Sequence, residues 1–216
     1  HYAKVLELGN AMTEILEAAS QMEMTTPAGT KLTCNIEGKR IDHASKRIFG
    51  AGEQTYPGGQ VSWYPDPQTI DGTLVFDGSV WPPEKIGLIN TPIKLSVKQG
   101  VVTAINGGSE ATALQRWFES WKNPSIYKLA HLSYGLNPEA LLTGNILEDE
   151  RVFGCLEVGI GAQPPHLGIF EVNPCEAVTG HTDGVMLNGT VKLDGELIEK
   201  EGVFVHPKLT KIIESF

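Results

Sequence analysis

The stretch IKLSVKQGVVTAING, residues 93–107, decides the fold class. It contains two short runs rich in Val, Ile and Leu, bounded by Gly and Asn, which is a pattern typical of β-strands. A third run of this kind, GTLVFDGSV at residues 72–80, comes before it. Short runs that follow one another with tight polar connections pair antiparallel, so this part of the chain predicts an antiparallel meander.

The segments on either side of the meander predict helices and further strands. Apolar residues recur at helical spacing from Val5 to Ala19 and from Glu110 to Lys122, and a short helix is expected near residues 138–142. Further strands are expected at residues 31–36, 39–41, 185–187, 190–193, 196–199 and 203–205, the first two as a hairpin. The mixture predicts an α+β fold with a mixed, mostly antiparallel sheet and a few packed helices.

The composition narrows the classes of partner. With 216 residues and a net charge of −9, the chain suits one domain that binds neither nucleic acid nor an anionic membrane. Its three cysteines form no CxxC pair, which favours the reducing cytoplasm. We expect a homo-oligomer, and four tryptophans would suit its interface where they prove exposed: Trp63, Trp81, Trp117 and Trp121.

Two of the six histidines stand in settings that suit metal binding. His131 follows an apolar run, and His181 lies two positions before Asp183, between a Gly-rich loop and a strand. Two imidazoles and a carboxylate form the ligand set that binds Fe(II) on one face and leaves the other face open. The alternative is that His181 and Asp183 only cap a turn through backbone hydrogen bonds.

A series of motifs resembles the aminopeptidase T family of metallopeptidases. The segments TTPAGTKLTCNIEGK, YPGGQVSWYPDPQTIDGTLVFDGSV, GLNPEALLTGNILEDERVFGCLEVGIG and GHTDGV occur in the family's order and approximate spacing. The resemblance covers the family's C-terminal part, so it implies that residues 1–216 form a metal-binding catalytic domain and that an N-terminal domain precedes it. The family carries a two-metal site in this part of the chain.

The ligands of that family match this sequence only in part. Its H-x-D matches His181 and Asp183, but a glutamate of the family falls on Gln60, another falls on His131, and a histidine falls on Glu157. Two divalent cations held close together need several carboxylates to offset their repulsion. The substitutions by Gln60 and His131 each remove one carboxylate.

The same departures resemble the 2,5-dihydroxypyridine 5,6-dioxygenases, an iron-binding branch of this superfamily. The resemblance implies one Fe(II) held by His131, His181 and Asp183, with Zn, Co or Mn as alternatives, and a reaction between O₂ and a hydroxylated heteroaromatic ring such as a dihydroxypyridine. The other hypotheses are a metal-dependent aminopeptidase and a catalytically silent domain of the same fold.

Four further residues are candidates for roles around such a metal. Glu157 is the candidate general acid/base, since it aligns with a ligand position that a three-ligand iron does not need; the alternative is a strand carboxylate paired with Lys or Arg. Gln60, Tyr64 and Glu53 lie in a loop rich in Gly and Pro and are expected to bind the substrate, unless they only decorate the surface. The acidic run at residues 148–150 is expected in solvent.

Overall fold

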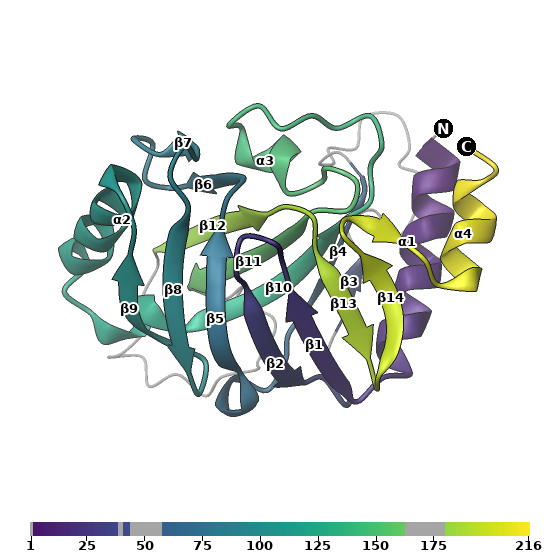
Figure 1. Cartoon of the computed structure of the whole chain (residues 1–216), viewed down its shortest axis with the longest axis horizontal. Coiled ribbons are helices and arrows are strands. Elements are labelled where there is room, and N and C mark those ends of the chain that lie inside the picture. The colour runs from purple at the N-terminus through teal and green to yellow at the C-terminus, as the bar shows by residue number, and fades with distance from the viewer. Residues whose placement is uncertain (1, 39–40, 44–57, 163–179) are drawn as a thin grey trace, which may run out of the picture.

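Two antiparallel sheets form the body of the computed structural model, which describes residues 2–38, 41–43, 58–162 and 180–216 (Figure 1). The eight-stranded sheet has the order β15 (Val203–Phe204), β14 (Glu196–Lys200), β13 (Thr190–Leu193), β1 (Gln21–Thr25), β2 (Lys31–Asn35), β5 (Asp71–Phe76), β8 (Ile93–Lys98) and β9 (Val101–Asn106). The seven-stranded sheet has the order β3 (Ile41–His43), β4 (Gln60–Trp63), β10 (Leu129–Gly135), β11 (Leu156–Gly161), β12 (His181–Met186), β6 (Ser79–Trp81) and β7 (Gly87–Leu88).

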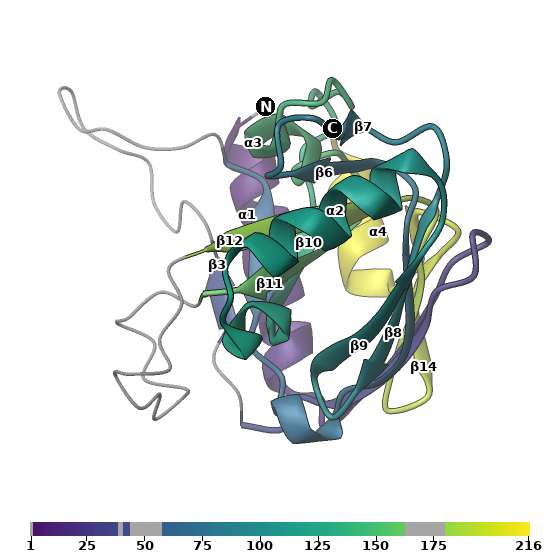
Figure 2. The same ribbon diagram turned by 90° about the vertical axis from the view of Figure 1, so that its left-hand side faces the viewer.

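The helices flank this pair of sheets. They are α1 (Tyr2–Glu17), α2 (Ser109–Ser120), α3 (Ile146–Asp149) and α4 (Pro207–Ile213), with short 3-10 turns η1 (Pro67–Thr69) and η2 (Pro124–Tyr127). Helices α1 and α4 lie side by side at one end of the sheets, and α2 lies at the other end (Figures 1 and 2). Among the helices that the structure describes, none is both long and apolar enough to cross a bilayer.

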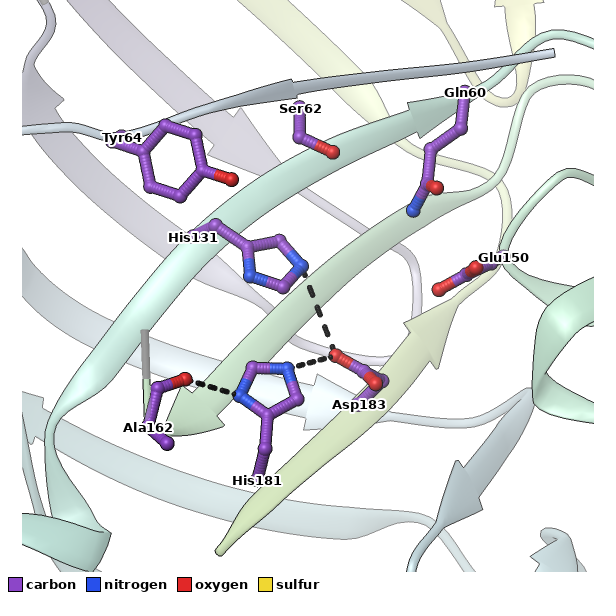
Figure 3. A pocket seen from close by; sticks show the side chains of 8 residues that line it. All are labelled: Gln60, Ser62, Tyr64, His131, Glu150, Ala162, His181 and Asp183. Carbon is purple, nitrogen blue, oxygen red and sulfur yellow. Dashed lines mark hydrogen bonds and ion pairs between the residues drawn. The ribbon is translucent and has the colours of Figure 1, made fainter. Parts of the chain in front are cut away.

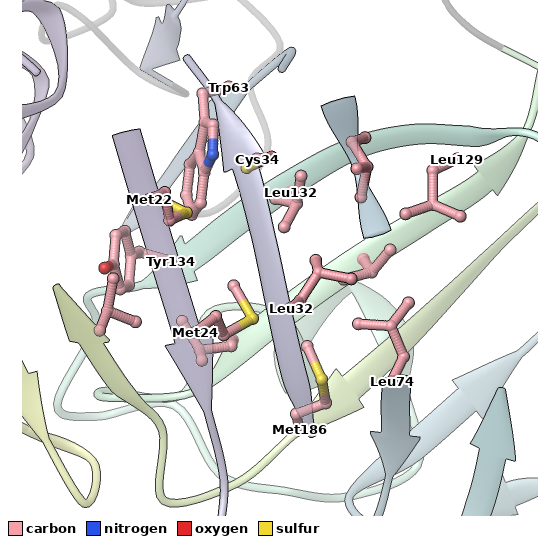
Figure 4. Packing of buried hydrophobic residues seen from close by; sticks show 14 of the residues in the cluster. Met22, Met24, Leu32, Cys34, Trp63, Leu74, Leu129, Leu132, Tyr134 and Met186 are labelled. Atoms are coloured by element: carbon pink, nitrogen blue, oxygen red, sulfur yellow. The ribbon is translucent and has the colours of Figure 1, made fainter. Parts of the chain in front are cut away.

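The main core lies between the two sheets. Strands β1 and β2 alternate between exposed and buried positions, so that Met22, Met24 and Leu32 point to the same side. These side chains meet Leu132 and Tyr134 of β10 from the other sheet (Figure 4). Strand β11 is buried at all its positions, because it lies in the middle of its sheet and both of its faces are covered.

The predicted fold class is confirmed, and most predicted elements are present. The helices predicted at residues 5–19 and 110–122 correspond to α1 and α2, and the meander is formed by β5, β8 and β9. The run predicted at residues 72–80 is divided, however, because its end belongs to β6 in the other sheet. On α2, Leu114 and Phe118 are buried, whereas Trp121, which follows the last residue of the helix, is 37% exposed. Trp81, at 42%, is the other exposed tryptophan among the four expected at an interface.

The predicted hairpin of residues 31–36 with 39–41 is wrong. Strand β2 pairs with β1 and β5, whereas β3 pairs with β4 in the other sheet. The segment QMEMT of β1 alternates in burial and is joined to β2 by a turn at Gly29, whose φ of 113° lies in the region that favours glycine. The partner of β2 is therefore the strand before it.

The short helix predicted near residues 138–142 is also wrong. The segment is a turn, and the helix that follows it is α3. Backbone N–H groups in this stretch donate to side-chain carboxylates: Leu141 to Glu148, and Thr143 and Gly144 to Asp149. Backbone N–H groups that donate to side chains in this way are not available for the hydrogen bonds of a helix.

Candidate metal centre

Three neighbouring strands bring the predicted ligands together. His131 lies on β10, and both His181 and Asp183 lie on β12, with β11 between these strands. In the strand register, Gly159 of β11 stands opposite His131 on one side and opposite Asp183 on the other. Residues opposite one another project from the same face of a sheet, so the three side chains converge over Gly159 (Figure 3).

The ligand atoms of His131, His181 and Asp183 all lie within 4.8 Å of one another. Oδ1 of Asp183 is 2.8 Å from Nε2 of His181 and 3.7 Å from Nε2 of His131. The two imidazole rings are stacked, with centroids 5.3 Å apart and an interplanar angle of 14°. Their side chains remain partly exposed, so the group can be reached from solvent.

Gly159 makes this close approach of the rings possible. A Cβ atom at this position would overlap Cε1 and Nδ1 of His131 and would lie 2.8 Å from Cε1 of His181. Both rings therefore pack directly against the backbone of β11 at Gly159. The sequence motif GCLEVGIG contains this glycine, but the prediction from sequence gave it no role.

The hydrogen bonds of His181 show that this group suits a cation. Its Nδ1 is 2.7 Å from the carbonyl oxygen of Ala162, and because a carbonyl only accepts, Nδ1 carries the proton. The lone pair of Nε2 then faces the Asp183 carboxylate at 2.8 Å, a contact between two acceptors. A proton or a metal ion must lie between them, and a neutral imidazole fixed by a carbonyl at its other nitrogen is the usual metal-ligating form.

The charges around Asp183 act in the same direction. Burial raises the pKa of Asp183, but His181 and then His131 outweigh it, and the pKa is lowered below its ordinary value. Burial lowers the pKa of His181, but the charge and hydrogen bond of Asp183 outweigh that effect and raise it. The pair therefore favours an anionic Asp183 carboxylate that faces positive charge.

Glu157 lies beside the group but does not line the cavity. Its side chain is fully buried, and Oε2 is 3.0 Å from Nε2 of His131. Burial raises its pKa well above the ordinary value, and the charges of Asp183 and Glu150 add to this, while a hydrogen bond from Ser133 opposes it. The alternative expected from the sequence, pairing with Lys or Arg, is not what the structure shows, because the partner is a histidine.

A cavity of about 410 Å³ opens above the three converging side chains. Its lining residues are Gln60, Ser62, Tyr64, His131, Glu150, Ala162, His181 and Asp183 (Figure 3). Two of the residues expected to bind substrate, Gln60 and Tyr64, are in this wall. The third, Glu53, lies outside the described residues.

The expectation of solvent exposure for residues 148–150 is wrong for two of the three. Asp149 is fully buried because it accepts the backbone N–H groups of Thr143 and Gly144. Glu150 is 7% exposed, is paired with Arg151 and lines the cavity. Burial raises the pKa of Glu150, although Arg151 opposes the shift. The sequence of a short acidic run does not show that its carboxylates are buried, since their burial depends on the loop that folds over them.

A second acidic group adjoins the first. Carboxylate oxygens of Glu150, Glu157 and Asp183 lie within 4.8 Å of one another. Asp183 thus belongs to both groups, and Glu157 also contacts His131 of the first group. Three close carboxylates cannot all remain charged without a compensating proton or cation.

Comparisons with known proteins identify a family for the chain. The family described as NicX: 2,5-dihydroxypyridine 5,6-dioxygenase matches residues 6–206. The 2,5-dihydroxypyridine 5,6-dioxygenase of Pseudomonas putida KT2440 is 28% identical over 162 residues, a match that covers 71% of this chain and 45% of that protein.

Two solved structures share the fold. The structure of 2,5-dihydroxypyridine dioxygenase from Pseudomonas putida KT2440 matches with a TM-score of 0.79 and 20% identity, over 95% of this chain and 61% of the other. Wild-type AmpT from Thermus thermophilus matches with a TM-score of 0.67 and 14% identity, over 94% and 55%. The chain spans between 45% and 61% of the length of these proteins. By its family match, the chain belongs to the 2,5-dihydroxypyridine 5,6-dioxygenase family.

Proposed function

We propose that this chain carries the metal site of a mononuclear non-haem Fe(II) dioxygenase that cleaves a hydroxylated heteroaromatic ring such as a dihydroxypyridine. The observation that carries the proposal is the convergence of His131, His181 and Asp183 at the floor of a cavity. Family membership supports the same reaction. Zn, Co and Mn remain alternative metals, because imidazole and carboxylate ligands suit them as well.

His131, His181 and Asp183 would hold the metal. Their side chains project from one face of the sheet toward the cavity, which would leave room for a ring and O₂. Fe(II) bound there supplies the redox chemistry that lets a ring react with O₂. The residues of the chain would position the metal and the ring in a partly enclosed cavity.

The walls of the cavity suit a flat polar ring. The ring of Tyr64 lies 6.0 Å from that of His131, which gives one aromatic surface beside the ligands. The Gln60 amide can both donate and accept hydrogen bonds. Both residues are proposed to orient the substrate.

Glu157 is proposed as the acid/base group. It contacts His131 and lies close to Asp183, but because it is fully buried it does not touch a ligand in the cavity directly. Any role of Glu157 in proton transfer would therefore act through its neighbours His131 and Asp183. Its position beside a metal ligand supports a function in holding or exchanging a proton near that ligand.

A metal-dependent aminopeptidase with two cations is the second candidate. The observation in its favour is the acidic group of Glu150, Glu157 and Asp183 next to the first site. A domain that has lost its catalytic activity is the third hypothesis.

We further propose a homo-oligomer in the cytoplasm. The exposed Trp81 and Trp121 support the oligomer, and the free, buried thiols of Cys34 and Cys155 support the reducing compartment.

Ring cleavage tests the proposal. The chain is loaded anaerobically with Fe(II), freed of excess metal and mixed with 2,5-dihydroxypyridine and O₂. We expect loss of the ring absorbance with one O₂ consumed per ring, and a loss of at least about 100-fold in rate for Asp183→Asn. Hydrolysis of N-terminal residues from peptides, with the ring untouched, would instead support the aminopeptidase.

A further inference from the structure

The side chain of Trp121 covers the backbone at the start of β12. Trp121 is the first residue after α2, and its indole is 37% exposed. A Cβ atom at Gly180 would overlap Cε2 and Cζ2 of this indole and would lie 2.8 Å from its Cδ2. The indole is therefore in direct contact with Gly180, the residue before His181. This contact joins the end of a helix to the strand that carries two of the three proposed metal ligands.

Two hydrogen bonds connect Gly180 to the imidazole of His181. The backbone N–H of Ala162 donates to the carbonyl oxygen of Gly180 at 2.7 Å. The carbonyl oxygen of Ala162 in turn accepts from Nδ1 of His181, also at 2.7 Å (Figure 3). An N–H at Nδ1 is present both in the protonated ring and in the neutral form that leaves Nε2 free for a metal, so either form is held in the same orientation.

The place of His181 in the sheet shows why its backbone needs support. His181 is the first residue of β12, and its partner in the register, Gly161, is the last residue of β11. The ends of paired strands open more easily than their middle. On the β11 side, the N–H of Gly161 donates to the carbonyl oxygen of Lys128 at 2.8 Å. On the β12 side, the indole of Trp121 lies against Gly180.

We propose that Trp121 is a positioning residue for the metal ligand His181. Its indole holds the backbone of Gly180, and the hydrogen bonds through Ala162 then keep the imidazole in place. In this orientation Nε2 of His181 is 2.8 Å from Oδ1 of Asp183, its fellow ligand. The inference rests on the proposed function, because it concerns the same metal site, but it does not depend on the reaction that the metal performs.

The affinity for Fe(II) tests the proposal without relying on turnover. It is measured anaerobically by competition with a metal-chelating dye. Trp121→Ala should bind Fe(II) at least about tenfold more weakly than the wild type, as is usual when a group that orients a ligand is removed. Because the indole is partly exposed, its loss opens a gap to water rather than an internal cavity, so the variant should stay folded. Trp121→Phe keeps an aromatic ring over Gly180 and should bind within about threefold of the wild type.

A buried residue of the same helix is the matched control. Leu114→Ala removes a fully buried side chain of α2, so it should lower the melting temperature more than Trp121→Ala does. Its affinity for Fe(II) should nevertheless stay within about twofold of the wild type. If Trp121 only stabilised the fold, the affinity would instead follow the melting temperature across these variants.

Substitution of Gly180 tests the contact from its other side. Gly180 is not among the described glycines with positive φ, and the three atoms nearest to an added Cβ all belong to the indole. Gly180→Ala should therefore displace the indole and weaken Fe(II) binding by at least about tenfold. In Trp121→Ala the added methyl group has room, so adding Gly180→Ala should change the affinity by less than about twofold.

Two results would overturn the inference. One is an unchanged Fe(II) affinity in Trp121→Ala, including the case in which sedimentation shows a changed mass and so assigns the residue to an interface alone. The other is a double variant in which the losses of Trp121→Ala and Gly180→Ala add. Failure of the proposed function looks different, because ring cleavage would then be absent while Trp121 still controlled Fe(II) affinity. A wild type that binds no Fe(II) would overturn both.

Discussion

Gly159 sets the distance between the two imidazole rings of the candidate metal centre. It lies in β11 beneath both rings, and a methyl group there would overlap His131 and crowd His181. The rings carry two of the three proposed ligand atoms, and the third is an oxygen of Asp183. The spacing of the metal ligands thus depends on a residue that contributes no ligand atom.

Replacing Gly159 by Ala should weaken metal binding. The added Cβ pushes both rings out of position, and disturbance of groups that orient ligands typically lowers metal affinity by about 10- to 100-fold. Competition with a metal-chelating dye measures the affinity, and circular dichroism shows that the sheet is intact. An alanine variant that binds the metal as tightly as the wild type would show that the rings can move aside without cost.

The sequence named His131, His181 and Asp183 as candidate ligands from the H-x-D motif and from the family resemblance, and the structure brings their ligand atoms within 4.8 Å of one another. Ser62 and Glu150 were not assigned to the wall. Their places depend on strand register and on the loop before α3, which no local motif encodes.

Strand β14 carries a buried carboxylate that makes stability depend on pH. Glu199 is fully buried, and within the described part of the chain neither of its oxygens has a hydrogen-bond partner. Burial raises its pKa well above the ordinary value. A group whose pKa is higher in the folded state stabilises the fold at low pH, and that contribution is lost as the pH rises through the folded-state value.

Glu199→Gln should remove this dependence. The variant and the wild type are expected to have similar stability near pH 4.5, and the variant should gain relative to the wild type as the pH rises toward 8, because it has no charge to bury. Urea unfolding at several pH values measures the difference. Glu23→Gln, at an exposed position of β1, is the control and should leave the pH profile unchanged. Parallel profiles for Glu199→Gln and the wild type would contradict the account.

Helix α1 contributes to the core through one face. Leu8 is fully buried in the main cluster, and the helix packs against α4, β3 and β4. Leu8→Ala should lower the free energy of unfolding by about 2–5 kcal/mol, because it leaves a cavity in a packed core. The neighbouring Glu7→Ala, on the exposed face, should change it by less than about 0.5 kcal/mol. Equal effects of the two in chemical denaturation would place the helix outside the cooperative fold.

The elements that the sequence predicted are those with a strong local period. Helix α1 and the meander of β5, β8 and β9 follow from residue spacing alone. The turn at residues 138–142 does not, because its backbone is bonded to carboxylates of a later segment. Strand β12 begins at His181, four residues before the predicted start, because its first residues, His, Thr, Asp and Gly, give no apolar run in the sequence.

The arrangement of the two sheets depends on contacts between distant parts of the chain. Strand β1 pairs with β13, so that Met22 stands opposite Leu193, and the candidate metal centre joins β10 to β12 across β11. Local patterns predict that strands exist and that they are antiparallel, but the choice of partner is made by burial over the whole molecule. The fold class was therefore predictable, whereas the sheet order was not.

The number of metal ions per chain tests most directly whether His131, His181 and Asp183 hold one ion together. Elemental analysis of anaerobically loaded protein should find one iron per chain in the wild type and less than about 0.1 in His131→Ala, with the variant still folded by circular dichroism. Two ions per chain in the wild type, or an unchanged iron content in His131→Ala, would contradict the account.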